Sequence, residues 1–152
     1  MFCISRAGHI SCLNNPYVSL WVLPLTSAVL LLDLAHRTVL WGFEPSEGTT
    51  IEQIAHSAEA PDEVIAVLAR EGGIPALAGL SIENGKREWI YEKFGKEPSY
   101  FSIFRDGHQL FVIHGSDRLK LLALEVRRIP GIRGMSISSL SVSYTHLRAH
   151  ET

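Results

Sequence analysis

The chain has 152 residues, which is the size of one ordinary domain, since domains hold about 100–200 residues. Its hydrophobic share of 46% and charged share of 20% are close to the globular average and exclude a disordered or fibrous class. The two cysteines, Cys3 and Cys12, give no disulfide framework, so we expect a protein of the reducing cytoplasm.

Acidic and basic side chains are divided unevenly along the chain, although the formal net charge is only -2. Residues 44–83 hold eight acids and the single base Arg70, whereas residues 86–141 hold ten bases and six acids. The first stretch should repel phosphate backbones, and the second weakly favours anions. We therefore do not expect a nucleic-acid partner.

Residues 17–32 form an almost continuously apolar stretch that contains Pro24. A membrane-spanning helix needs about 20 predominantly apolar residues, and a signal peptide needs a basic start and a cleavage site, so neither is expected here. Membrane association through residues 17–32 stays open as an alternative to a cytoplasmic protein. Residues 1–26 are set apart as an apolar N-terminal extension.

Two apolar runs, Ala28–Leu34 and Thr38–Phe43, flank His36-Arg37 and predict either a hairpin or one helix. A stronger signal is Asn84-Gly85 between Leu80–Glu83 and Lys86–Tyr91, because a type I′ turn needs positive φ at both central residues.

Asp106-Gly107 repeats this turn chemistry between Phe101–Arg105 and His108–His114. The strands of this second predicted hairpin are apolar on both faces. We therefore expect it to be central and covered.

Two short helices are expected after residue 49. Thr50 and Gln53 form a capping-box pattern, followed by Ile51, Ile54, Ala55 and Ala58 at helical spacing. Pro61 then suits the first turn of a second helix, and Gly72-Gly73 ends it.

A third helix is expected from Ser116 or Asp117 to about Arg128, followed by a strand over residues 132–140. With the strand that starts at Leu110, this order predicts a βαβ unit. The expected fold class is α+β: two short helices, antiparallel hairpins and a C-terminal βαβ unit in a single domain over residues 27–141, truncated at its C-terminus.

The last eleven residues, Val142–Thr152, resemble one reading frame of the transposon-type adapter used in tagmentation libraries. All eleven residues fit that frame, and Ser141 fits the adapter bases just upstream. We therefore expect residues 142–152 to be an adapter-derived tail that is excluded from the natural fold.

Residues 50–91 resemble a winged helix-turn-helix, because Ala55, Ile65 and Leu68 fall at its buried spacing and Asn84-Gly85 is placed like the tip of a wing. This resemblance implies DNA binding. The would-be recognition helix begins Pro61-Asp62-Glu63, however, and carries acids where phosphate binding needs bases.

The region Leu110–Leu140 is similar to half of a ferredoxin-like ligand-sensing or dimerisation module. The order of elements also resembles the roadblock and longin scaffolds, which bind GTPases and other partners. Neither resemblance has a diagnostic motif, and likeness of fold says little about function.

One candidate anion or ligand site lies where a strand is expected to meet a helix N-terminus, at His114-Gly115-Ser116-Asp117, with Arg118 and His108 nearby. The alternative is that Gly115 makes the turn and Ser116 or Asp117 only caps the helix.

A candidate partner-contact surface consists of Trp89 and Tyr91 with Lys86 and Arg87. Cross-strand aromatic residues commonly just stabilise a hairpin, and that interpretation stays open for these four.

No metal site or cofactor is expected, because Cys3, His9 and Cys12 match no zinc pattern and lack a fourth ligand. No catalytic constellation is evident, since Ser116 and His114 are only a nominal pair.

We therefore expect a small regulatory or partner-binding protein without catalytic activity, which contacts another protein or a second copy. The alternatives are a winged-helix DNA-binding regulator with a truncated ligand-sensing module, and a fragment of an enzyme whose active site lies partly beyond Ser141.

Overall fold

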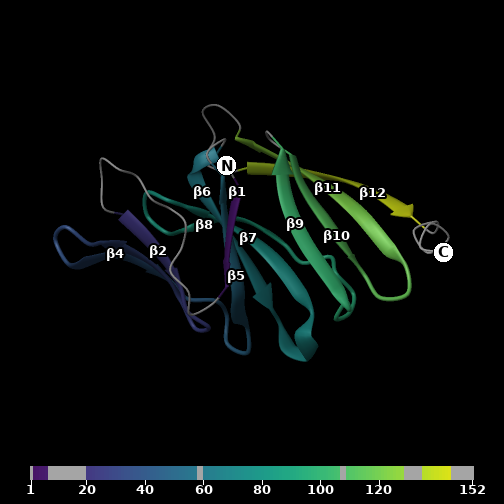
Figure 1. The fold of residues 1–152 in the computed structure, drawn as a ribbon, viewed down its shortest axis with the longest axis horizontal. Coiled ribbons are helices and arrows are strands. Elements are labelled where there is room, and N and C mark those ends of the chain that lie inside the picture. The colour runs from purple at the N-terminus through teal and green to yellow at the C-terminus, as the bar shows by residue number, and fades with distance from the viewer. Residues whose placement is uncertain (1, 7–19, 58–59, 107–108, 129–134, 145–152) are drawn as a thin grey trace. The chain divides into compact units, whose positions relative to one another are not determined.

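The computed structural model describes residues 2–6, 20–57, 60–106, 109–128 and 135–144. Within these ranges the chain is all-β: its strands form three antiparallel sheets, and a short 3-10 turn, η1 (Glu71–Gly73), is the sole helical element (Figure 1). The chain divides into two compact units, Met1–Lys96 and Glu97–Thr152. The predicted boundaries at residues 26 and 141 stay predictions.

The first unit contains a five-stranded sheet of order β1-β5-β6-β7-β8. Its strands are β1 (Phe2–Arg6), β5 (Thr50–Ser57), β6 (Ala60–Ala69), β7 (Pro75–Ser81) and β8 (Arg87–Tyr91). Residues 63–68 of β6 and 75–80 of β7 are all buried. A strand that is buried on both faces has apolar residues in succession, which explains the sequence Val64-Ile65-Ala66-Val67-Leu68.

The first unit also contains a three-stranded sheet of β2 (Leu20–Pro24), β3 (Val29–Asp33) and β4 (Thr38–Phe43). One buried cluster joins the two sheets: Val22, Val29, Leu31 and Trp41 from the small sheet pack with alternate residues of β6 and β7 and with Ile51 and Ile54 of β5. The unit is therefore a two-layer sandwich, the usual way for a sheet to bury its apolar face.

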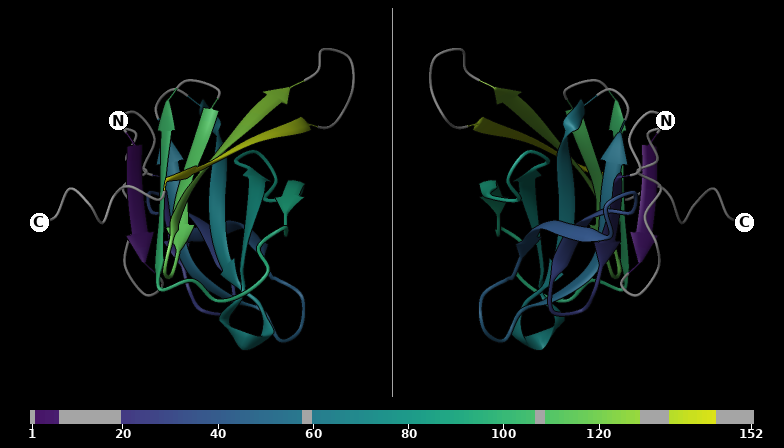
Figure 2. Two further views of the ribbon diagram at one scale, coloured as in Figure 1. Left: turned by 90° about the vertical axis from the view of Figure 1, so that its right-hand side faces the viewer. Right: turned by 90° about the vertical axis from the view of Figure 1, so that its left-hand side faces the viewer.

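The second unit contains a four-stranded meander in which each strand pairs with the next along the chain. Its strands are β9 (Tyr100–Asp106), β10 (Gln109–Gly115), β11 (Leu119–Arg128) and β12 (Met135–Tyr144). The longest two, β11 and β12, run side by side as an antiparallel pair (Figures 1 and 2).

The predicted helix pair after residue 49 is wrong, because this region forms the antiparallel strands β5 and β6. A β-bulge between Ile51 and Gln53 explains the misleading pattern. The bulge places Ile51 and Ile54 on the same buried face although they are three residues apart, which is the spacing of a helical face.

The predicted βαβ unit is wrong as well. Residues expected to form its helix belong to strand β11, which pairs antiparallel with both β10 and β12. Without these helices the winged helix-turn-helix, ferredoxin-like, roadblock and longin resemblances are not supported, and the α+β class is replaced by an all-β one.

The three predicted hairpins are present in the structure. Strands β3 and β4 pair across the turn 34–37, which confirms the hairpin over the single helix. The predicted hairpins at Asn84-Gly85 and Asp106-Gly107 are confirmed by the pairing of β7 with β8 and of β9 with β10. The type I′ turn expected at Asn84-Gly85 is wrong, because Gly85 has positive φ and Asn84 does not.

The expectation that the hairpin at Asp106-Gly107 is central and covered is wrong. Strand β9 ends the order of its sheet, and Phe104 is 41% exposed. The apolar residues on both faces of β9 therefore do not indicate that β9 lies in the centre of its sheet.

Of the apolar stretch 17–32, the described part forms β2 and β3. In the described ranges no helix has the length and apolar character that crossing a membrane requires. At the other end, β12 continues past Ser141 through Tyr144, while residues 145–152 lie outside the described residues. Backbone pairing does not bear on the origin of the last eleven residues, which stays a prediction.

Candidate functional site

The two faces of the β9–β12 sheet differ sharply in exposure. Side chains alternate between the faces of a strand, and paired residues on neighbouring strands share a face. One face is deeply buried and carries Ile103, Leu110, Val112, Leu122, Leu124 and Val126. The opposite face carries Phe104, Phe111, Ile113, Leu121 and Ala123, which are half-buried or exposed. The second face is thus an apolar surface in contact with solvent.

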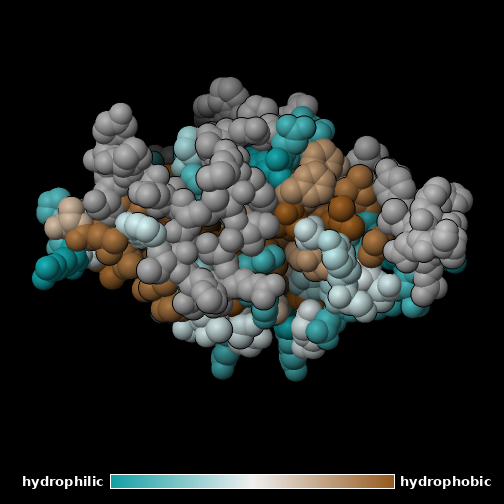
Figure 3. Space-filling view, viewed as in Figure 1, coloured by the Kyte–Doolittle hydropathy of each residue, from teal (hydrophilic) through white to brown (hydrophobic). Residues whose placement is uncertain are grey.

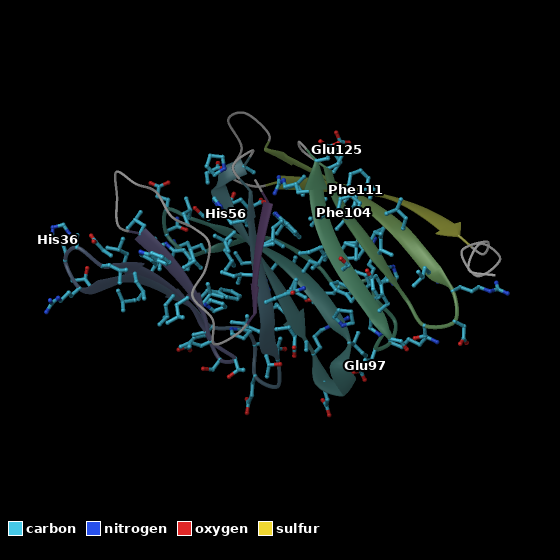
Figure 4. All side chains as sticks on the ribbon, viewed as in Figure 1. His36, His56, Glu97, Phe104, Phe111 and Glu125 are labelled. Carbon is cyan, nitrogen blue, oxygen red and sulfur yellow. The ribbon has the colours of Figure 1, made fainter. Side chains whose placement is uncertain are left out.

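Three aromatic residues stand out on this surface, and we call Tyr100, Phe104 and Phe111 the aromatic strip. Phe104 of β9 pairs directly with Phe111 of β10, and their rings stack at a centroid distance of 5.0 Å and an interplanar angle of 17°. Figure 4 shows the two residues side by side on neighbouring strands. Tyr100 lies on the same face and is 51% exposed.

The aromatic strip lies along the edge of its sheet. In the part of the chain that the structure describes, β9 pairs with β10 alone, so its other backbone edge has no strand partner. Apolar residues cover much of the surface over β9–β11 in the space-filling view (Figure 3). Long apolar edge strands of this kind are templates for pairing with another chain.

The predicted anion site falls on the turn between β10 and β11, where the helix N-terminus that it required is absent. Gly115 has φ 146°, and a Cβ there would overlap the carbonyl oxygen of Arg118. The turn therefore requires glycine for steric reasons. Ser116 Oγ accepts a hydrogen bond from the backbone N–H of Ser99 at 3.1 Å, and Asp117 and Arg118 are exposed.

His114 is half-buried at the end of β10, directly opposite Lys120 of β11. Burial lowers the pKa of the His114 imidazole, and the positive charge of Lys120 lowers it further. Both effects favour the neutral ring, which is poorly suited to hold an anion by charge. His108 lies outside the described residues, and anion binding at this turn stays a prediction.

No family model and no curated protein matches this chain. The proposals below therefore depend on the geometry of its own residues.

The four residues of the predicted partner surface lie in and just before β8 and differ in exposure. Trp89 is buried, and its Nε1–H donates to Oε2 of Glu63 at 3.0 Å. Tyr91 is half-buried and makes an edge-to-face contact with Phe94, with ring centroids 5.2 Å apart, and burial raises the pKa of its hydroxyl. Lys86 and Arg87 are exposed. Both aromatic side chains make packing contacts within the first unit, and partner contact through these four residues stays a prediction.

In the described ranges no group of three or more His, Cys, Asp and Glu side chains is placed to hold a metal ion. Of the three residues considered for zinc, Cys3 lies in β1, and His9 and Cys12 lie outside the described residues.

The aromatic strip was missed by the sequence reasoning, although a signal for it was present. In residues 100–106, period-two alternation places Tyr100 and Phe104 on one face with Ser102 and Asp106. Two polar residues on that face indicate solvent, whereas the opposite face carries the buried Ile103.

Proposed function

We propose that this chain acts by binding a protein partner, through the edge strand β9 and the aromatic strip beside it. The observation that carries the proposal is the exposure of Tyr100 (51%) and Phe104 (41%) on a strand whose outer backbone edge has no strand partner among the described residues. Exposed apolar patches rimmed by polar groups mark interaction sites in soluble proteins.

The bound segment would be an extended strand of the partner. Backbone hydrogen bonds to β9 provide affinity without sequence preference, and alternate side chains packing on the aromatic strip provide specificity. Burying one large apolar side chain stabilises a complex by at most about 1.5–3 kcal/mol. A micromolar Kd corresponds to a binding free energy of about 8 kcal/mol. Burial of two partly exposed aromatic residues therefore supplies part of that free energy.

A random-peptide selection on the immobilised full chain tests this proposal. We expect the selected peptides to alternate apolar and polar residues, and to bind Phe104→Lys at least about tenfold more weakly, since a charge on this face must be desolvated on binding. Leu40→Lys is the matched control, because Leu40 is an exposed apolar residue on β4 of the other unit (51%, against 41% for Phe104).

Equal binding of the selected peptides to the wild type and to both variants would place the contact elsewhere. Concentration-dependent sedimentation of the wild type that Phe104→Lys abolishes would identify the partner as a second copy of the chain.

A further inference from the structure

The first unit has a hollow between the end of β4 and the ends of β6, β7 and β8, with a volume of about 390 Å³ that includes the solvent at its mouth. Phe43, Leu68, Ala76 and Ile90 are apolar residues of its lining. On β6 the core-facing positions end at Leu68, and the next residue on that face is Arg70. The apolar core therefore opens into a rim that carries two arginines and two glutamates, Arg70, Arg87, Glu44 and Glu92.

Arg70 holds a fixed positive charge at this rim. Its Nη2 donates to the backbone carbonyl oxygens of Pro75, Glu92 and Phe94 at 3.2, 3.0 and 3.2 Å. The Nε–H of Arg70 is buried and has no acceptor within the described ranges. Because three backbone carbonyls fix the guanidinium, its position does not depend on a bound ligand.

Arg87 provides a second cation on the rim, and it is free to bind. It is exposed and forms no ion pair in the part of the chain that the structure describes. Glu92, in contrast, lies with Oε2 4.0 Å from Nη1 of Arg70, so its charge is partly offset. A guanidinium has a planar set of N–H donors that matches the two oxygens of a carboxylate.

We propose that this hollow binds a small carboxylate that carries an apolar group. The carboxylate pairs with Arg87 in the field of Arg70, and the apolar group packs on Phe43, Leu68 and Ile90. Pockets for small ligands combine an apolar lining with a few polar groups in this way. The site is separate from the aromatic strip, with which it shares no residue.

The test is a titration of the ¹⁵N-labelled full chain with N-acetyl-L-leucine, followed by amide chemical shifts. We expect saturable shifts at Thr49, Arg87 and Ile90, and none with L-leucinamide, which has the same side chain and a positive charge. Arg87→Gln should weaken binding at least about tenfold, because a charge-assisted bond is lost. Lys86→Gln is the matched control, since it removes the neighbouring exposed charge from outside the lining.

Three results would overturn the proposal. The first is no saturable shift at these amides up to about 20 mM, a range that detects a Kd as weak as about 1 mM. The second is binding of L-leucinamide as tight as that of N-acetyl-L-leucine. The third is unchanged affinity in Arg87→Gln, whose spectrum also shows whether the variant is folded.

Discussion

The indole of Trp89 lies across Gly79 of the neighbouring strand, where a Cβ would overlap its Nε1 atom. Its N–H reaches beyond β7 to the buried carboxylate of Glu63 on β6, at 3.0 Å. The absence of a side chain at Gly79 thus allows one tryptophan to connect three strands.

Replacement of Gly79 by alanine should therefore destabilise the protein by about 1–3 kcal/mol, the usual cost of overpacking a closed interior. Urea unfolding, followed by the fluorescence of the tryptophans, measures this cost. Gly95→Ala is the matched control: no atom lies within 4 Å of the position that its added methyl group would take, and we expect a change within about 0.5 kcal/mol. Equal unfolding midpoints for the two variants would contradict the packing described for Trp89.

The two buried indoles donate to acceptors of different charge, so we expect Trp89→Phe and Trp41→Phe to lower the free energy of unfolding by different amounts. Trp89 donates to a carboxylate, whereas Trp41 donates to the backbone carbonyl of Ile82 at 2.8 Å. Hydrogen bonds to charged groups contribute about 1.5–3 kcal/mol and neutral ones about 0.5–1.5 kcal/mol. Trp89→Phe should therefore cost about 1 kcal/mol more than Trp41→Phe in the free energy of unfolding.

Repeating both substitutions in a Glu63→Gln background tests the cause of that difference. With a neutral acceptor at position 63 the two costs should converge, because both indoles then donate to neutral groups. A difference that persists in this background would assign it to packing instead.

The parts of the fold that depend on local turn chemistry were predictable. At Asn84-Gly85, the Asn84 side chain accepts a hydrogen bond from the N–H of Lys86 at 2.9 Å, and Gly85 has φ 71°. The acceptor side chain of Asn84 and the positive φ of Gly85 can both be expected from this dipeptide alone. The strands β5, β6 and β11 were not predictable from periodicity: β6 is buried on both faces, β5 is shifted by a bulge, and β11 carries apolar residues on its half-buried face as well as on its buried one. In each case the pattern does not separate strand from helix.

The sites depend on pairings between distant residues, which the sequence pattern does not show. Trp89 was a candidate for partner contact because Tyr91, Lys86 and Arg87 lie beside it in the same hairpin. Nothing in that hairpin shows that its N–H donates to Glu63 on β6. Phe104 was expected to be covered because its strand is apolar on both faces. Ser102 and Asp106 on its own face were a local sign of solvent, whereas the place of β9 at the end of its sheet is set by distant pairings. Exposure of a strand is decided by the neighbours that the fold gives it.

His114 should make folding stability depend on pH. Its pKa in the folded protein lies below the ordinary value of 6.5, so the unfolded chain binds more protons between the two values. Its contribution is therefore fully present above pH 6.5 and is lost as the pH falls from 6.5 through the folded pKa. Urea unfolding at pH 7.5 and 5.5 should show a smaller loss of stability in His114→Gln than in the wild type.

Lys120→Gln separates the two causes of the His114 shift. Removing the positive charge opposite the imidazole should raise the pKa of His114 toward 6.5, as followed by its ring resonances. An unchanged titration in this variant would leave burial as the sole cause.

Asp33 and His36 form a second pH-dependent contact, in the turn between β3 and β4, where Figure 4 shows His36 at the tip of the hairpin. The Nδ1 of His36 lies 2.8 Å from Oδ2 of Asp33, and the backbone N–H of His36 donates to Oδ1 at 3.2 Å. The side-chain hydrogen bond from His36 lowers the pKa of Asp33 below its ordinary value of 3.8. The stabilising contribution of Asp33 is thus present above pH 3.8 and is lost as the pH falls through the folded pKa.

Titration of the Asp33 carboxyl carbon by NMR measures this contact directly. We expect His36→Gln to raise the pKa of Asp33 toward 3.8, because the imidazole donor is removed, while the backbone N–H at position 36 remains. Arg37→Gln is the control, since it removes the adjacent positive charge without touching either hydrogen bond. If Arg37→Gln moves the titration as far as His36→Gln does, the general charge of the turn, rather than the hydrogen bond from His36, determines the pKa of Asp33.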